Sequence, residues 1–218
     1  MNTRKVFLSL GLFSNMFLFI ACDQQKKNVA DQGPVPGQIP AVINDSGSLG
    51  IDKSPMDMIY FPVDYPKEKM ITPGLENPLA RVIYSRPQKN GRTIFADSST
   101  AKNFIQHYGQ EWRLGANEAT EIEFFKAATI QGKKIPAGRY ILYCIPYKDT
   151  WKIIFNSNLF SWGLHMDKTK DIAEIELPAG KSNTQAEYFT MLFQKASYGC
   201  DLLMAWGDVK VTMPIGFN

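Results

Sequence analysis

The chain contains few of the residues from which metal and redox sites are built. It has only three cysteines and two histidines among 218 residues. Neither His107 nor His165 has a carboxylate at the spacing of a metal-binding helix motif, and neither Cys144 nor Cys200 belongs to a Cys-x-x-Cys pair. We therefore expect no metal site and no cofactor.

The sequence also lacks the motif of a catalytic serine and the motif of a nucleotide-binding loop. Ser85 and Ser197 do not lie in a Gly-x-Ser-x-Gly turn, which would expose a serine hydroxyl for catalysis. No glycine-rich phosphate loop with its Gly-Lys ending follows an expected strand. The sequence therefore gives no support for nucleotide hydrolysis, and a catalytic triad could arise only from residues distant in the chain.

Long runs of basic charge are absent, which argues against a nucleic-acid partner. The chain has 24 Lys and Arg against 21 Asp and Glu, and two of the basic residues lie in the first five positions. Beyond them no basic run is longer than Lys26-Lys27 or Lys133-Lys134. A nucleic-acid footprint needs a clustered basic patch, so we expect no such partner.

The N-terminus has the pattern of a secretion signal. Arg4 and Lys5 precede an apolar run over residues 6–20, and Phe19-Ile20-Ala21-Cys22 resembles the lipobox of bacterial lipoproteins, in which the cysteine carries the lipid. The alternatives are an ordinary signal peptide and a short membrane anchor. Spanning a bilayer takes about 18 apolar residues, and polar residues interrupt this run. We expect cleavage before Cys22 and lipidation of Cys22.

The rest of the chain divides into a tether and one domain. Residues 22–57 are rich in Gln, Gly, Pro, Ser and Asp and poor in aromatics, which is typical of a flexible linker. Residues 58–218 are expected to form a single folded domain. The stretch after Cys22 lacks an acidic run, so we expect a lipid-anchored protein of the bacterial cell envelope that faces the periplasm.

The sequence pattern of the domain is typical of an all-β fold. Short runs of β-branched and aromatic residues alternate with turn signals such as Asn90-Gly91 and Gln131-Gly132. This predicts an antiparallel β-sandwich of about ten strands, with one short helix over residues 100–108. The expected strands cover residues 79–85, 91–95, 118–125, 129–135, 139–145, 151–156, 172–177, 186–194, 200–206 and 209–214.

Cys144 and Cys200 leave two alternatives open. In an oxidising compartment they could form a disulfide. Otherwise both are buried free thiols that pack as small apolar side chains. Sequence alone does not say whether the two residues lie within bonding distance.

The domain contains several short motifs that are characteristic in combination. They are Tyr84-Ser85-Arg86-Pro87, Lys89-Asn90-Gly91-Arg92, Glu111-Trp112-Arg113-Leu114-Gly115-Ala116-Asn117-Glu118-Ala119-Thr120, Pro136-Ala137-Gly138-Arg139-Tyr140, Ile145-Pro146 with Trp151, and Leu203-Met204-Ala205-Trp206. Together these motifs resemble the DUF2911 family of bacterial proteins of unknown function, often secreted or lipid-anchored in bacteria of the Bacteroidetes type. The resemblance covers residues 79–215 and implies a β-rich domain without an established activity.

One cluster of polar residues adjoins the ends of two expected strands. Its members could recognise a ligand: Arg86, Arg92, Trp112, Arg113, Asn117 and Glu118. Guanidinium groups bind carboxylate or phosphate through two hydrogen bonds, and a tryptophan ring can stack on a flat ligand. Alternatively, Glu118 and Arg113 or Arg86 form a partly buried structural ion pair.

These residues leave three functions open. The first is a non-catalytic binding or structural module for a small anionic or sugar-like ligand. The second is a glycan-acting hydrolase that uses Glu118, although spacing nominates no second carboxylate. The third is a scaffold for envelope protein assembly. Trp162 lies in a turn, where an exposed ring could contact a sugar, whereas Trp151 and Trp206 are expected in the core.

Overall fold

The computed structural model describes residues 54–97 and 102–217. The expected signal peptide, Cys22 and most of the expected tether lie outside these residues. The described part is all-β, with eleven strands, one α-helix, α1 (Tyr65–Ile71), and a short 3-10 helix, η1 (Lys168–Lys170). The predicted fold class is confirmed.

Nine strands form one antiparallel sheet in the order β1-β2-β5-β8-β9-β10-β11-β6-β7, and β3 and β4 form a separate parallel pair. The strands are β1 (Met56–Phe61), β2 (Ala80–Ser85), β3 (Thr93–Ala96), β4 (Phe104–His107), β5 (Thr120–Phe124), β6 (Ala128–Ile130), β7 (Lys133–Ile135), β8 (Gly138–Pro146), β9 (Thr150–Asn156), β10 (Asp171–Ala196) and β11 (Gly199–Phe217).

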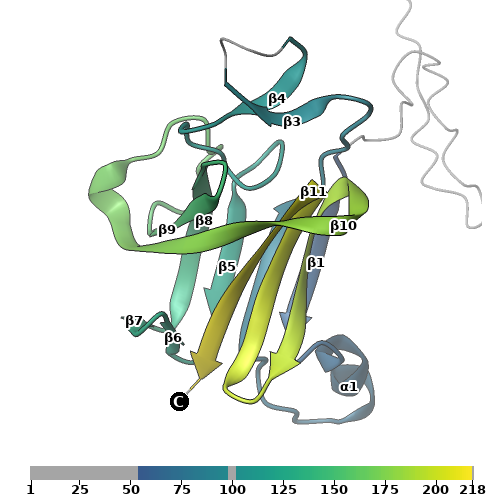
Figure 1. Ribbon diagram of the computed structural model, residues 1–218. Helices are drawn as coiled ribbons and strands as arrows, with labels where there is room; N and C mark the ends of the chain where they lie inside the picture. The colour runs from purple at the N-terminus through teal and green to yellow at the C-terminus, as the bar shows by residue number, and fades with distance from the viewer. Residues whose placement is uncertain (1–53, 98–101, 218) are drawn as a thin grey trace, which may run out of the picture. The chain divides into compact units, whose positions relative to one another are not determined.

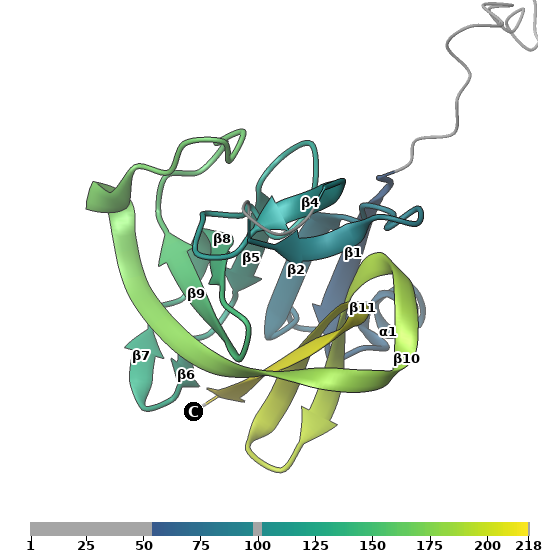
Figure 2. The ribbon, with the colours of Figure 1, turned by 45° about the horizontal axis from the view of Figure 1, so that its top comes forward.

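Strand β10 belongs to both layers of the β-sandwich. Its first part, residues 171–178, pairs with β9, and its last part, residues 190–196, pairs with β11. Figures 1 and 2 show β10 crossing from one layer to the other, so that the hairpin of β10 and β11 lies over β1 and β2. Shifts in pairing register between residues 181 and 190 allow this strand to bend without breaking.

Aromatic contacts between the layers fill the core. The ring of Phe61 in β1 lies 6.0 Å from that of Phe193 in β10, and the ring of Tyr84 in β2 lies 5.8 Å from that of Phe189. Phe95 in β3 packs edge-on against Trp112 at 5.5 Å. In Figure 1 the β3–β4 pair lies at one end of the two layers. Phe95 belongs to the buried core cluster, so this pair contributes to the core.

Side chains of β5 alternate between the buried core and the outer face of the sheet. Ile122 and Phe124 of β5 are buried, whereas Glu121 and Glu123 lie on the opposite face. There Glu123 pairs with Arg81 at 2.5 Å and Glu121 pairs with Arg139. Cross-strand pairs of opposite charge stabilise this outer face.

The predicted helix is wrong in position. Residues 104–107 form β4, which pairs in parallel with β3, and the helix lies at Tyr65–Ile71 instead. The helix buries none of its residues, so its sequence carries no apolar stripe to reveal it. Residues 129–135 are two strands around a reversal at Gln131 and Gly132, both with positive φ, as the turn signal predicts.

The two cysteines of the described part are free and buried. The disulfide alternative is therefore wrong here. Cys144 lies in β8 and pairs with Ile153 and Trp112, while Cys200 pairs with Lys195 at the start of β11. Both side chains pack into the apolar core.

Candidate functional site

A strained loop, residues 112–119, organises the candidate site. Leu114 and Asn117 both have positive φ, at 52° and 61°, a conformation that non-glycine residues adopt at a cost of about 1–3 kcal/mol. The loop is held by Trp112, whose indole Nε1 donates to the carbonyl of Gly115 at 3.1 Å. Thr120 Oγ1 donates to the carbonyl of Leu114 at 2.6 Å. These bonds fix the backbone before β5 begins.

This loop borders a cavity of about 280 Å³, which we term the arginine pocket. Three of the six predicted site residues line it: Arg92, Trp112 and Arg113. The other lining residues are Ser54, Pro87, Ile105, Gln106, Glu111, Gly115, Ala116, Gly163, Leu164 and Trp206. The walls thus come from the β2–β3 loop, β4, the loop over residues 112–119, the β9–η1 loop and β11.

Arg92 is fixed by its own turn. Its Nε donates to the carbonyl of Lys89 at 3.1 Å, and its Nη2 donates to the carbonyl of Gln88 at 2.7 Å. These bonds leave Nη1 without a hydrogen bond among the described residues. The half-buried guanidinium is therefore held in place by backbone oxygens, and within residues 54–97 and 102–217 it forms no ion pair with a carboxylate.

Arg113 is held in a similar way on the other side. Its Nη1 donates to the carbonyl of Asn117 at 2.5 Å and to that of Trp162 at 3.1 Å. Burial lowers the pKa of this guanidinium, because it removes water that would stabilise the charged form. Within the described part of the chain Arg113 forms no ion pair with a carboxylate. Its Nε and Nη2 keep free donor capacity within the described structure.

Aromatic rings form the inner wall of the arginine pocket. Trp112 and Trp206 are stacked, with ring centroids 5.6 Å apart and planes at 19°. Trp206 is fully buried, and its indole Nε1 has no hydrogen-bond partner in the described residues. A buried donor without a partner costs about 1–3 kcal/mol.

One acidic side chain also lines the pocket. The carboxylate of Glu111 is paired with Lys168 at 2.8 Å, so its charge is offset from outside the cavity. Among the described residues, no group of three or more His, Cys, Asp or Glu side chains could hold a metal ion. The charged side chains on the pocket wall are thus Arg92, Arg113 and the Lys168-paired Glu111.

Arg86 does not line the arginine pocket but connects strands of the sandwich. Its Nη2 donates to Thr190 Oγ1 at 3.1 Å, and its Nη1 lies 3.6 Å from the carboxylate of Asp57. The guanidinium also lies over the ring of Tyr188, 6.0 Å from its centroid. Arg86 thus joins β2 to β10 and β1.

Asn117 and Glu118 also lie outside the arginine pocket. Asn117 is exposed and places its Nδ2 3.5 Å from the carbonyl of Ser54. Glu118 is exposed, and in the described part of the chain it makes no hydrogen bond or ion pair. The predicted structural ion pair between Glu118 and an arginine is therefore wrong, because the turn at Asn117 rotates Glu118 out of the alternation that starts at Thr120.

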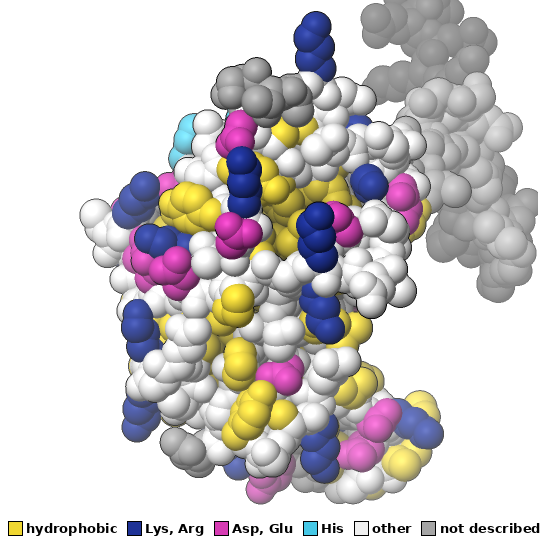
Figure 3. Space-filling view, in the orientation of Figure 1, with side chains coloured by type: hydrophobic (Ala, Val, Ile, Leu, Met, Phe, Trp, Pro, Cys, Tyr) yellow, Lys and Arg dark blue, Asp and Glu magenta, His cyan; other side chains and the backbone are white. Residues whose placement is uncertain are grey.

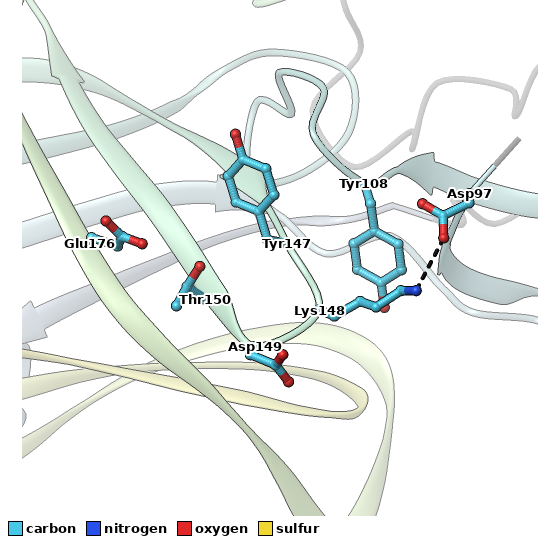
Figure 4. Close-up of a pocket in the computed structure, with 7 residues that line it drawn as sticks. All are labelled: Asp97, Tyr108, Tyr147, Lys148, Asp149, Thr150 and Glu176. Carbon is cyan, nitrogen blue, oxygen red and sulfur yellow. Dashed lines mark ion pairs between the residues drawn. The ribbon is translucent and has the colours of Figure 1, made fainter.

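A larger cavity, of about 490 Å³, was not predicted from the sequence. Figure 4 shows that its side chains come from the β8–β9 turn, from β10 and from the ends of β3 and β4. Lys148 forms an ion pair with Asp97 at 3.3 Å beside the ring of Tyr108. No sequence motif joins the residues that line this cavity, because they lie up to 79 positions apart in the chain. They are Asp97, Tyr108, Tyr147, Lys148, Asp149, Thr150 and Glu176.

The surface charge is mixed. Figure 3 shows acidic and basic side chains interspersed on the visible face, with no field of one sign. Within residues 54–97 and 102–217, no helix has the length and hydropathy to cross a membrane.

The comparisons with known proteins agree with the motifs. The model of the family described as "Protein of unknown function (DUF2911)" matches residues 66–215, which is most of the described chain. Searches of curated proteins and of solved structures give no match. The matched span contains β2 to β10, the strained loop and both pocket arginines, and on this evidence the chain belongs to the DUF2911 family.

Proposed function

We propose that this protein is a lipid-anchored component of the bacterial cell envelope that binds a small organic anion in the arginine pocket. One observation carries the proposal. Among the five arginines of the described chain, three form ion pairs with carboxylates, and the two that do not, Arg92 and Arg113, line the same cavity. Backbone oxygens hold both guanidinium groups in place, and among the described residues neither group has a carboxylate counterion.

The physical argument concerns unpaired charge. A partly buried guanidinium without a counterion loses hydration and gains no ion pair, which costs free energy. An anion between Arg92 and Arg113 would accept hydrogen bonds from the donors that the protein leaves unused. Hydrogen bonds between charged partners are shorter and stronger than neutral ones.

The pocket also limits the size and shape of the ligand. At about 280 Å³ it lies just below the usual range for drug-sized ligands. Trp112 and Trp206 add apolar surface to the wall of the pocket. A carboxylate, phosphate or sulfate attached to a small ring fits these features, which includes an acidic sugar.

A thermal-shift screen tests the proposal. The full chain, purified in detergent, is heated with small carboxylates, sugar phosphates and acidic sugars. A ligand at about 100 times its Kd stabilises the protein by about 2.7 kcal/mol, which corresponds to a midpoint rise of about 5–10 °C for a domain of this size. Neutral analogues of the same shape are the control and should leave the midpoint unchanged. Equal shifts for charged and neutral analogues would contradict the proposal.

The lipid anchor is tested separately. In a bacterial host fed a labelled fatty acid, the wild-type chain should carry the label and enter the membrane fraction. Cys22→Ser should lose both properties. Protease added to intact cells should leave the protein uncut if it faces the periplasm. A wild-type chain without label, or a labelled Cys22→Ser variant, would refute lipidation at Cys22.

A further inference from the structure

We propose a second binding site, for a neutral sugar ring, in a hollow beside the start of β5. The hollow has a volume of about 150 Å³, which limits it to a single ring. We term it the aromatic hollow, and its lining is Glu118, Ala119, Glu121, Phe160, Ser161 and Trp162. It is distinct from the arginine pocket, because the two cavities share no lining residue.

Two aromatic side chains stand exposed on the rim of this hollow. Phe160 is 82% exposed and Trp162 is 57% exposed, although both belong to the most hydrophobic residue types. Phe160 also has a φ of 61°, which is rare for a bulky side chain. Exposed aromatics on a strained backbone are typical of a binding surface, because nothing in the packing of the core requires them there.

The backbone that carries these rings is held rigidly. The carbonyl of Trp162 accepts a hydrogen bond from Arg113 at 3.1 Å, and Ser161 Oγ accepts one from the N–H of Gly163 at 3.1 Å. Gly163 lies so close to Ala119 that an added Cβ would come within 2.8 Å of the Ala119 Cβ. The backbone at Trp162 and Gly163 is therefore fixed before any ligand arrives, which lowers the entropy cost of binding.

The polar groups of the hollow match sugar hydroxyls. Glu121 is fixed by its ion pair with Arg139, whose guanidinium also lies 5.5 Å from the ring centroid of Phe160. Glu118 makes no hydrogen bond or ion pair among the described residues, so both of its carboxylate oxygens can accept. Sugar hydroxyls are donors to such acceptors, while the C–H face of the sugar ring can pack on an aromatic side chain.

The charge balance selects against an anionic ligand. Glu118 and Glu121 carry two negative charges, and Arg139 offsets one of them. The hollow would therefore repel an acidic sugar, in contrast to the arginine pocket. A quaternary ammonium group could also use an aromatic ring and a carboxylate, so the experiment includes a probe of that kind.

The test is saturation-transfer NMR with three probes on the full chain. Methyl β-D-glucopyranoside and N-acetylglucosamine represent neutral sugars, and tetramethylammonium represents the cation. A polyoxyethylene detergent is used, because sugar and choline head groups would compete for the site. The sugars should give transfer signals, and tetramethylammonium should give none.

Variants assign the signals to the hollow. Trp162→Ala and Glu118→Gln should each weaken sugar binding about tenfold, equivalent to about 1.4 kcal/mol. Tyr198→Ala and Glu76→Gln replace an exposed aromatic and an exposed carboxylate elsewhere, so both should bind as the wild type does. Because the two site residues are exposed, both site variants are expected to keep the wild-type melting midpoint.

Three outcomes would overturn the inference. The first is that neither sugar binds, and the second is that sugar binding is unchanged in both site variants. The third is that tetramethylammonium binds and the sugars do not. The last result would identify the hollow as a cation site. None of these results depends on whether the arginine pocket binds an anion.

Discussion

Arg113 Nη1 donates a hydrogen bond to the carbonyl of Trp162 at 3.1 Å, although 49 positions separate the two residues. This bond joins the strained loop before β5 to the loop that follows β9. Each loop contributes to both cavities, because Arg113 and Gly163 line the arginine pocket while Glu118 and Trp162 line the aromatic hollow. The geometry of both candidate sites therefore depends on how closely these two loops pack.

Gly163 is the point of closest packing, and Gly163→Ala should disturb it. The new Cβ would lie 2.8 Å from the Cβ atoms of Arg113 and Ala119, and the φ of 80° already disfavours a side chain. We expect the free energy of unfolding to fall by about 2–4 kcal/mol, from strain together with overpacking. Urea denaturation measures this change.

Gly74→Ala is the matched control for that substitution. Gly74 has a φ of 78°, but an added Cβ would meet no atom within 4 Å. This variant should lose only about 1 kcal/mol, the cost of the positive φ alone. Equal losses at the two positions would show that the contact between the loops contributes nothing.

Ionisation of Tyr84 in the unfolded chain should lower the free energy of unfolding at high pH. Burial raises the pKa of its hydroxyl from 10.0 to about 12. Below pH 10 the hydroxyl is protonated in both the folded and the unfolded chain, so its contribution is complete. Above pH 10 the unfolded chain releases the proton first, and about 2–3 kcal/mol of stability is lost as the pH rises to 12.

Tyr84→Phe separates this effect from the hydrogen bonds of the hydroxyl. The hydroxyl accepts from the N–H of Met191 at 2.8 Å, and removing it leaves that buried donor without its partner. The variant should be less stable than wild type by about 1–3 kcal/mol at pH 8. Between pH 10 and 11.5 its stability should fall less steeply than that of the wild type. Parallel pH profiles would mean that Tyr84 does not titrate differently on unfolding.

Cys144 and Cys200 should resist alkylation in the folded protein. Burial raises the pKa of the Cys144 thiol well above its usual range and that of Cys200 to about 12, and the thiolate is the reactive form. Iodoacetamide followed by peptide mapping should label neither residue in buffer and both in guanidinium without reductant. Labelling in guanidinium only after reduction would show a disulfide between them.

The all-β class and most strand positions were predictable because alternation is a local signal. Ile122 and Phe124 face the core while Glu121 and Glu123 face outward, and neighbours two positions apart are enough to show this. The lengths of β10 and β11 were not predictable. Pro178 and Gly207 are typical of strand ends. However, Pro178 of β10 pairs with Thr150 of β9, and Gly207 of β11 pairs with Ala186 of β10, so both strands continue through these positions.

The pairing of β3 with β4 also escaped prediction, because it depends on contacts that no local pattern records. Phe95 packs against Trp112, Trp151 and Trp206, which come from three other parts of the chain. Only the folded core determines that residues 104–107 lie alongside β3.

The candidate site was predictable in part. Arg92, Trp112 and Arg113 meet at one cavity, whereas Arg86 is used by the frame of the fold and Glu118 is turned outward at Asn117. Sequence proximity grouped all of these residues. It could not show which arginines would find a carboxylate partner, because Asp57 meets Arg86 only when β1 pairs with β2.

The most direct test is the affinity of the wild type and three arginine variants for the anion that gives the largest thermal shift. Isothermal titration of Arg92→Gln and Arg113→Gln should show binding weakened about tenfold or more, since each loses charge-assisted hydrogen bonds of about 1.5–3 kcal/mol. Arg86→Gln, which removes a neighbouring arginine outside the pocket, should bind as the wild type does. Unchanged affinity in Arg92→Gln and Arg113→Gln, or an equal loss in Arg86→Gln, would contradict anion binding in the arginine pocket.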